Sequence, residues 1–135
     1  MSYKIEEIEG IGPSFAEKLG KAGIDTTDAL LAKCAAAAGR KEVAAATGVS
    51  ETNLLKWSNL ADLMRVSGIG PQFSELLEAA GVDTIKELRH RNAENLAEKM
   101  AEVNAEKKLA RVAPAATVVE GWVKAAKTMD PKIEY

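Results

Sequence analysis

The stretch Gly10-Ile11-Gly12-Pro13 decides how this chain is interpreted, because it returns 58 residues later as Gly68-Ile69-Gly70-Pro71. A shift of 58 places residues 8–32 over residues 66–90, and 12 of these 25 positions are identical without a gap. Beyond the quoted tetrapeptide, the identical pairs are Phe15/Phe73, Glu17/Glu75, Leu19/Leu77, Ala22/Ala80, Gly23/Gly81, Asp25/Asp83, Thr26/Thr84 and Leu30/Leu88. Identity at one fixed offset indicates a duplicated structural unit.

Each copy is typical of a tight hairpin between two helices. The glycines permit positive φ, Ile11 and Ile69 are expected to anchor the turn in the core, and Pro13 and Pro71 suit the first position of a helix. Apolar residues then follow at spacings of three and four, which predicts a helix.

Helix boundaries follow from capping chemistry. We expect Gly23 and Gly81 to end the helix in the left-handed conformation. Thr26 and Thr84 then begin the next helix, and Thr84 with Glu87 fits a capping box that copy one lacks.

Two further helices are predicted in each copy. In copy one, residues 40–47 are helical, Gly48 turns the chain and Ser50 caps a helix that presents Leu54, Trp57, Ala61 and Met64 on one face.

In copy two, Asn92 caps a helix to about Val103, a break follows near Asn104 or 112–114, and Thr117 with Glu120 caps the last helix. That helix presents Val119, Trp122, Val123 and Ala126. Trp57 and Trp122 are 65 residues apart, so copy two carries about seven extra residues near 105–111. Both tryptophans lie among apolar residues at helical spacing, which favours a core position over base stacking.

The predicted fold is therefore all-α, with two tandem, packed helix-hairpin-helix subdomains. Their expected bounds are residues 1–58 and 59–129, with an extended tail at 130–135. No Gly/Ser-rich or Pro-rich joint separates the copies, which favours packed subdomains over a flexible linker.

Composition narrows the function classes. The net charge of −2 and the pI of about 5.5 argue against a strong nucleic-acid binder, whose domain is usually basic. One cysteine and one histidine disfavour a disulfide or a zinc site. Cys34 is expected to be a small buried residue. We expect no cofactor and, because a leader and a membrane-spanning apolar run are both missing, a cytoplasmic protein outside the membrane.

The motifs also resemble known families. Ile8-Glu9-Gly10-Ile11-Gly12-Pro13, then Ala22 to Thr26, then Thr47 to Ser50, resembles the N-terminal helix-hairpin-helix domain of archaeal and eukaryotic RecA-like recombinases, a SAM-like fold. The similarity covers residues 5–64 and, less completely, 63–127. The tandem form resembles a bacterial family of small helix-hairpin-helix proteins described as a domain of unknown function.

The resemblance implies a phosphate contact, because the hairpin amides of DNA-binding relatives point at a phosphate from a helix N-terminus. Such a contact is blind to base sequence. The residues carried over are Gly10, Ile11, Gly12, Lys18 and Lys21 in copy one, and Gly68, Gly70 and Arg65 in copy two.

The two copies differ in charge at this position. Leu76 and Ala79 replace the two lysines, and Glu75 and Glu78 lie beside them. Copy two is therefore interpreted as a structural repeat. Glu9 opposes a phosphate at hairpin one, where hairpin two has a serine. The remaining cations, Arg40, Lys41, Lys86, Arg89, His90, Arg91, Lys107, Lys108 and Arg111, are expected to lie on solvated helix faces.

Two functions remain open. One is sequence-independent nucleic-acid binding through hairpin one, and the other is a protein–protein adaptor or self-associating scaffold. Nothing in the sequence resembles a nucleophile–base pair, a phosphate loop or a metal-binding acidic cluster, so we do not expect an enzyme. The oligomeric state is left open.

Overall fold

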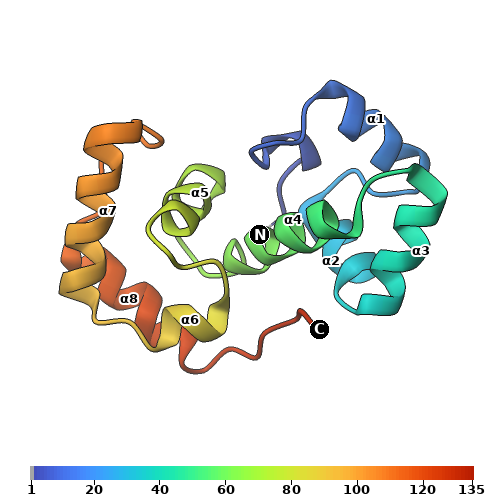
Figure 1. The fold of residues 1–135 in the computed structure, drawn as a ribbon. Helices are drawn as coiled ribbons and strands as arrows, with labels where there is room; N and C mark the ends of the chain where they lie inside the picture. Colours follow the sequence, from blue (N-terminus) through green and yellow to red (C-terminus); the bar gives the residue numbers. More distant parts are fainter. Residues whose placement is uncertain (1) are drawn as a thin grey trace. The chain divides into compact units, whose positions relative to one another are not determined.

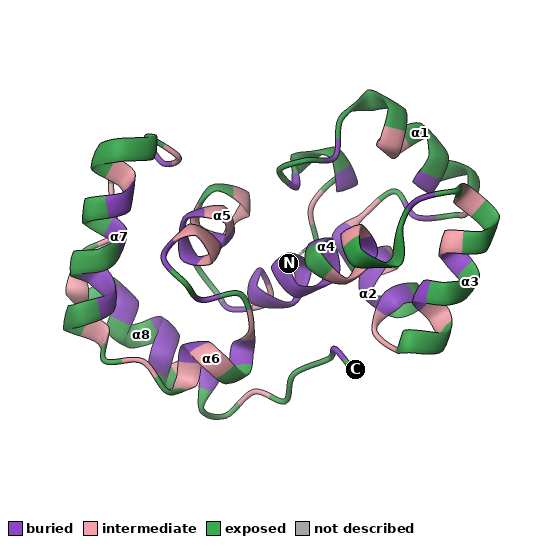
Figure 2. Ribbon diagram, viewed as in Figure 1, coloured by how far each residue is buried: buried purple, intermediate pink, exposed green. Residues whose placement is uncertain are grey.

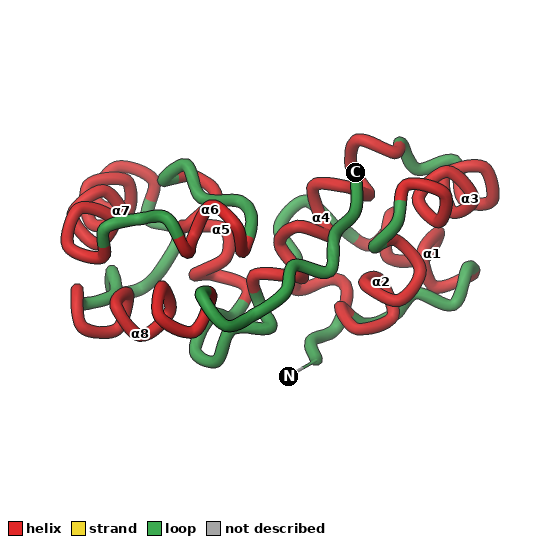
Figure 3. The backbone as a smooth tube through the Cα atoms, turned by 90° about the horizontal axis from the view of Figure 1, so that it is seen from below, coloured by secondary structure: helices red, strands yellow, loops and turns green. Residues whose placement is uncertain are grey.

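The protein is all-helical in this computed structural model, which describes residues 2–135 (Figure 1). One 3-10 turn and eight α-helices follow one another in these residues, without a named strand (Figure 3). Their bounds are η1 Ile5–Glu7, α1 Pro13–Lys21, α2 Thr27–Cys34, α3 Ala37–Thr47, α4 Glu51–Leu63, α5 Pro71–Ala79, α6 Ile85–Arg89, α7 Ala93–Lys107 and α8 Ala116–Ala126. The predicted all-α class is confirmed.

The chain divides into two compact units. The first unit contains residues up to Asp62 together with Lys132–Tyr135, and the second unit contains Leu63–Pro131. The boundary predicted after residue 58 falls inside α4, four residues before the end of the first unit at Asp62. The predicted separate tail, residues 130–135, is divided between the two units after Pro131. The segment Lys132–Tyr135 contains no helix, and it belongs to the first unit.

In the first unit, α1 packs against η1 and α3, and α2 packs against α3. The core is formed by aliphatic residues of η1 and the helices, by aliphatic residues of the turns between them and by one tryptophan, and most of α4 is buried (Figure 2). Its fully buried members include Ile5, Ile8, Leu19, Ile24, Leu30, Leu54 and Leu60. The face of α4 predicted from helical spacing is buried as expected at Leu54, Trp57 and Ala61. Met64, the fourth residue of that prediction, is also buried, but it follows the end of α4 and belongs to the second unit.

In the second unit, α7 packs against α8 and α5, and α8 also contacts α6. Its continuous core includes Leu76, Leu77, Leu88, Met100 and Trp122. The predicted face of α8 is buried, which confirms its helical periodicity.

Most predicted helix ends are confirmed. Pro13 and Pro71 occupy the first turn of α1 and α5, and Gly23 and Gly81 have φ of +82° and +99°. Side-chain oxygens of Thr26, Ser50, Thr84 and Asn92 accept amide hydrogen bonds at the starts of α2, α4, α6 and α7.

Three local predictions are wrong. Helix α8 begins at Ala116 with Ala115 as its cap, so Thr117 lies within the first turn and does not cap it. Helix α7 runs past its predicted end near Val103 to Lys107, and Lys108 ends it with φ +53°. The break therefore lies at 108–115, which includes the predicted alternative at 112–114 and excludes Asn104. The Asn104 side chain instead accepts the Ala110 amide at 2.8 Å, which holds the loop containing the extra residues.

The third correction concerns Thr84 and Glu87. The threonine hydroxyl accepts the Glu87 amide, but the Glu87 carboxylate accepts from Arg91, so the described contacts make half of the expected capping box.

Candidate phosphate-contact hairpins

The two Gly-Ile-Gly turns have the same backbone conformation. Gly10 has φ +94° and Gly68 has φ +93°, a region that side chains with a Cβ rarely enter. The amide of Ile11 donates to Ile8 at 3.1 Å, and that of Ile69 donates to Val66 at 3.0 Å. The isoleucines are buried, as expected, so each turn is fixed to its core by one side chain.

The second glycine of each turn serves a different purpose. Gly12 and Gly70 have φ of −83° and −95° and are the N-caps of α1 and α5. Of the two glycines that permit positive φ, only the first in each turn adopts it. A glycine N-cap leaves the first-turn amides without a side-chain acceptor.

Hairpin one exposes these groups to solvent. Gly10 and Gly12 are exposed, and the amides of Ser14 and Phe15 lie in the first turn of α1, where an α-helix offers no internal acceptor. Pro13 contributes no amide hydrogen. The positive end of the helix dipole adds to the attraction for an anion at this position.

A tryptophan lies beneath each turn. The Nε1 atom of Trp57 is 3.3 Å from the position of a Cβ added to Gly10, and that of Trp122 is 3.1 Å from a Cβ added to Gly68. The Trp57 ring also contacts Phe15, with centroids 5.2 Å apart, and the Trp122 ring contacts Phe73 at 5.3 Å.

The core position predicted for both tryptophans is confirmed, but their contact with the hairpin glycines was missed. Trp57 follows its glycine by 47 residues and Trp122 follows its glycine by 54. The unequal spacing hides the fact that the two tryptophans occupy equivalent positions in the two copies. The presence of one tryptophan in each copy could have indicated this equivalence.

The two candidate lysines of copy one have different surroundings. Lys18 Nζ lies 5.7 Å from the centroid of the Phe15 ring, a cation–π distance on the exposed side of α1. Lys21 is the last residue of α1 and pairs with Glu17 at 3.6 Å. With a rise of 1.5 Å per residue, Lys18 lies about 7.5 Å along the axis from Pro13 and Lys21 about 12 Å. Only Lys18 is close enough to assist an anion at hairpin one.

Hairpin two has lost this basic surrounding. Leu76, which replaces Lys18, is fully buried. Arg65 donates from Nη2 to the Asp130 carbonyl at 2.7 Å, within the second unit. Gly70 is half-buried, whereas Gly12 is exposed. Of the candidate residues, Gly10 and Gly12 lie in the exposed hairpin, Lys18 lies on the helix that follows it, and Arg65 serves an internal contact.

Acidic groups also surround hairpin one. Glu6, Glu7 and Glu9 are all exposed, and the Glu7 carboxylate accepts the Lys4 amide at 2.9 Å. The equivalent positions of copy two are Met64, Arg65 and Ser67. Hairpin one therefore combines an open helix N-terminus with nearby negative charge.

The expectation that all remaining cations are solvated is wrong for three arginines. Arg40 is 5% exposed and donates to the carbonyls of Cys34, Ala35 and Glu134 at 2.9, 2.8 and 2.6 Å. Arg89 donates to the Met129 carbonyl.

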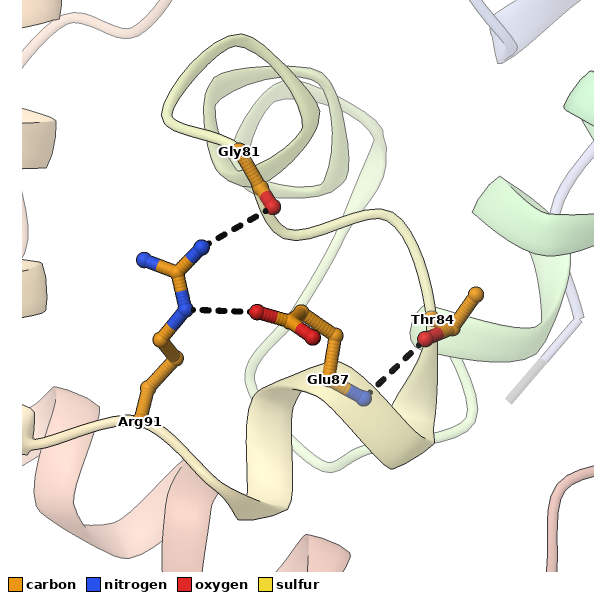
Figure 4. A network of polar contacts seen from close by, with 4 residues as sticks. All are labelled: Gly81, Thr84, Glu87 and Arg91. Carbon is orange, nitrogen blue, oxygen red and sulfur yellow. Dashed lines mark hydrogen bonds and ion pairs between the residues drawn. The ribbon is translucent and has the colours of Figure 1, made fainter.

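Arg91 donates to Gly81 and Glu87 at 3.1 and 2.8 Å and closes the turn before α6 (Figure 4). His90, by contrast, is exposed as expected. These arginines satisfy main-chain carbonyls of the fold, so they do not extend a basic surface.

Other chemistry is limited in the described residues. Cys34 is fully buried, and burial raises the pKa of its thiol, against smaller opposing effects of Arg40 and Lys33. Within residues 2–135, no three side chains of the metal-binding types come together. No helix in the same residues is long and apolar enough to cross a bilayer.

The model of the family described as a domain of unknown function (DUF4332) matches residues 9–129. The chain belongs to this family. The matched residues contain both hairpins and both tryptophans, so the duplicated pattern lies within the family's domain. No curated protein and no solved structure matches the chain significantly.

Proposed function

We propose that this DUF4332 protein is a non-catalytic binding module that contacts the phosphate backbone of nucleic acid through hairpin one. One observation carries the proposal: Gly10 and Gly12 are exposed at the N-terminus of α1, where first-turn amides have no side-chain acceptor. A phosphate oxygen is the ligand that such amides and the helix dipole favour.

Two further points support the phosphate contact. Lys18 lies on the same exposed helix, within about two turns of the hairpin, and adds a mobile positive charge. The resemblance to helix-hairpin-helix domains of RecA-like recombinases supplies an analogy of function, which is weaker than an argument from the site. A contact to phosphate alone would not select a base sequence.

Hairpin two is proposed to be structural. Its backbone has the same φ values, but the position of Lys18 holds the buried Leu76, and Arg65 is engaged by the Asp130 carbonyl. We therefore expect one phosphate contact for each chain and modest affinity.

The test uses the matched substitutions Gly12→Asp and Gly70→Asp. Asp is a favourable N-cap, so each variant should keep or gain helix stability. At hairpin one its carboxylate would also occupy the amides and repel phosphate. We expect Gly12→Asp to weaken binding to fluorescein-labelled duplex or single-stranded DNA at least tenfold at low salt, and Gly70→Asp to change it less than twofold.

Two outcomes contradict the proposal. One is the absence of binding at tens of micromolar protein in low salt, and the other is equal binding by wild type and Gly12→Asp. A Lys18→Gln variant should weaken binding several-fold and lower its salt dependence, because one fewer counterion is released.

A protein–protein adaptor is the second candidate, and a specific observation favours it. Glu6, Glu7 and Glu9 form an exposed acidic edge beside hairpin one, while Arg40, Arg65 and Arg89 serve internal carbonyls. A basic protein partner suits such an edge. Light scattering for self-association and pull-down with Glu6→Lys/Glu9→Lys as control would test it, and recovery of nucleic acid alone would reject it.

A further inference from the structure

Helix α4 buries polar side chains of the first unit. Asn59 is 7% exposed and Asp62 is 2% exposed, although a helix usually turns apolar residues toward a core. Buried polar groups are stable only with hydrogen-bond partners. Both residues receive hydrogen bonds from the segment Lys132–Tyr135, which belongs to the same unit.

The segment is held by its backbone and by two side chains. The Lys132 amide donates to Asp62 Oδ2 at 3.0 Å, and the Tyr135 hydroxyl donates to Asn59 Oδ1 at 3.1 Å. Ile133 is buried, whereas Lys132, Glu134 and Tyr135 are exposed, so Tyr135 is held by its hydroxyl and not by burial of its ring.

The end of α2 supplies the other contacts. The Glu134 amide donates to the Ala35 carbonyl at 2.7 Å, and Arg40 Nη2 donates to the Glu134 carbonyl at 2.6 Å. Arg40 is positioned for this role because its Nη1 donates to the Cys34 and Ala35 carbonyls. Both main-chain groups of Glu134 are thus satisfied by a buried guanidinium and a carbonyl of the first unit.

We propose that the first unit carries a recognition groove for an extended peptide with an aliphatic residue two positions before a tyrosine. The groove is lined by Ala35, Arg40, Asn59 and Asp62, and the segment Lys132–Tyr135 is its occupant within the chain. The contacts are those of peptide recognition: main-chain hydrogen bonds hold an extended segment, and one buried aliphatic side chain with one hydroxyl selects it.

Covalent connection explains why the groove is closed in the intact chain. A tethered ligand has an effective concentration of about a millimolar or more, so a short peptide in solution cannot displace it easily. The groove becomes available when the tethered segment is weakened. This site uses residues other than those of hairpin one, so it does not rest on the proposed phosphate contact.

The test uses the 135-residue chain with Ile133→Asp, which removes the buried anchor of the tethered segment. The probe is a fluorescein-labelled peptide with the sequence of residues 129–135, followed by anisotropy. We expect the variant to bind this peptide at least tenfold more tightly than the wild-type chain does. Adding Asn59→Ala to the variant should weaken binding several-fold, whereas adding Glu51→Gln, an exposed change on the same helix, should not.

The peptide carries its own controls. Replacing its isoleucine with aspartate should abolish binding, and replacing its tyrosine with phenylalanine should weaken it several-fold. Alanine at the lysine and glutamate positions should be tolerated, because both side chains are exposed and both residues make their hydrogen bonds through main-chain groups.

If Ile133→Asp prevents folding, addition of the peptide must restore the helical circular dichroism signal. The proposal is overturned if the folded variant fails to bind at about 2 mM protein. It is also overturned if wild type and variant bind equally, or if the unfolded variant is not rescued.

Discussion

The indole nitrogen of Trp57 lies 3.3 Å from the position that a Cβ on Gly10 would occupy, and Trp122 stands in the same relationship to Gly68 at 3.1 Å. Two features therefore require glycine at the first position of each turn: the positive φ of its backbone, and the indole that occupies the space where a Cβ would lie. The contact between tryptophan and glycine links the last core helix of each copy to its hairpin. The same contact is present in copy two, although about seven extra residues separate the tryptophan from its glycine there.

Gly10→Ala and Gly68→Ala should each lower the free energy of unfolding by about 1–3 kcal/mol, because a Cβ strains the backbone and crowds the indole. Gly68→Ala should cost more, since its indole is closer. Gly20→Ala is the matched control: Gly20 lies inside α1 with nothing within 4 Å of an added Cβ, so alanine should raise stability by about 0.5–1 kcal/mol. Urea denaturation followed by circular dichroism would measure all three, and a neutral Gly10→Ala would contradict the account.

Arg40→Gln should destabilise the chain by about 2–4 kcal/mol. The substitution leaves the carbonyls of Cys34, Ala35 and Glu134 with fewer donors in a buried position. Lys41→Gln is the control. The side chain of Lys41 is exposed next to Arg40 in the sequence, so this substitution should change stability by less than about 0.5 kcal/mol. Thermal denaturation of both variants would decide whether Arg40 is structural, and similar melting temperatures would reject that role.

Thr84→Ala should cost about 1 kcal/mol, because the hydroxyl accepts the Glu87 amide at the start of α6. Thr117→Ala should change stability by less than about 0.5 kcal/mol, since Thr117 is exposed inside the first turn of α8. The two substitutions remove the same atoms from residues that the sequence alone treats as equivalent caps. Chemical denaturation should therefore separate them, and an equal loss would restore the original assignment of Thr117.

The Cys34 thiol should make stability depend on pH in the alkaline range. Burial raises its pKa in the folded state above the ordinary thiol value of about 8.5. The contribution is complete below the unfolded-state pKa and is lost as the pH rises toward the folded-state pKa.

The free energy of unfolding of wild type should therefore fall more between about pH 8 and about pH 10 than that of Cys34→Ala. Urea titrations at the two pH values give the comparison, with each protein serving as its own reference. Parallel declines in the two proteins would show that another group is responsible.

Local rules of the sequence predicted much of the fold. Pro13 at the start of α1, Gly23 at its end and Thr26 as the next cap were found correctly, because each depends on its own φ, ψ and nearest amides. The same rules gave the wrong cap at Thr117, because its pattern also suits a helix that begins two residues earlier, with Ala115 as the N-cap.

The candidate site was predicted only in part. The exposure of Gly10 and Gly12 and the loss of Lys18 in copy two could be expected from the sequence. The pairing of Lys21 with Glu17 was also within reach, because it is an i,i+4 contact. The engagement of Arg65 by Asp130 was not, because 65 residues separate them.

By itself, the sequence determined the duplication, the helical class and the conformation of the Gly-Ile-Gly turns, since these follow from steric and capping preferences over a few residues. Tertiary structure decided the partners: which carbonyls the arginines bind, which tryptophan supports which glycine, and where Lys132–Tyr135 is held. The physical reason is range. A guanidinium or an indole is placed by whatever comes within about 3–4 Å after folding. The partner of Arg40 in the segment Lys132–Tyr135 lies 94 residues away in the sequence, and the partner of Arg89 lies 40 residues away.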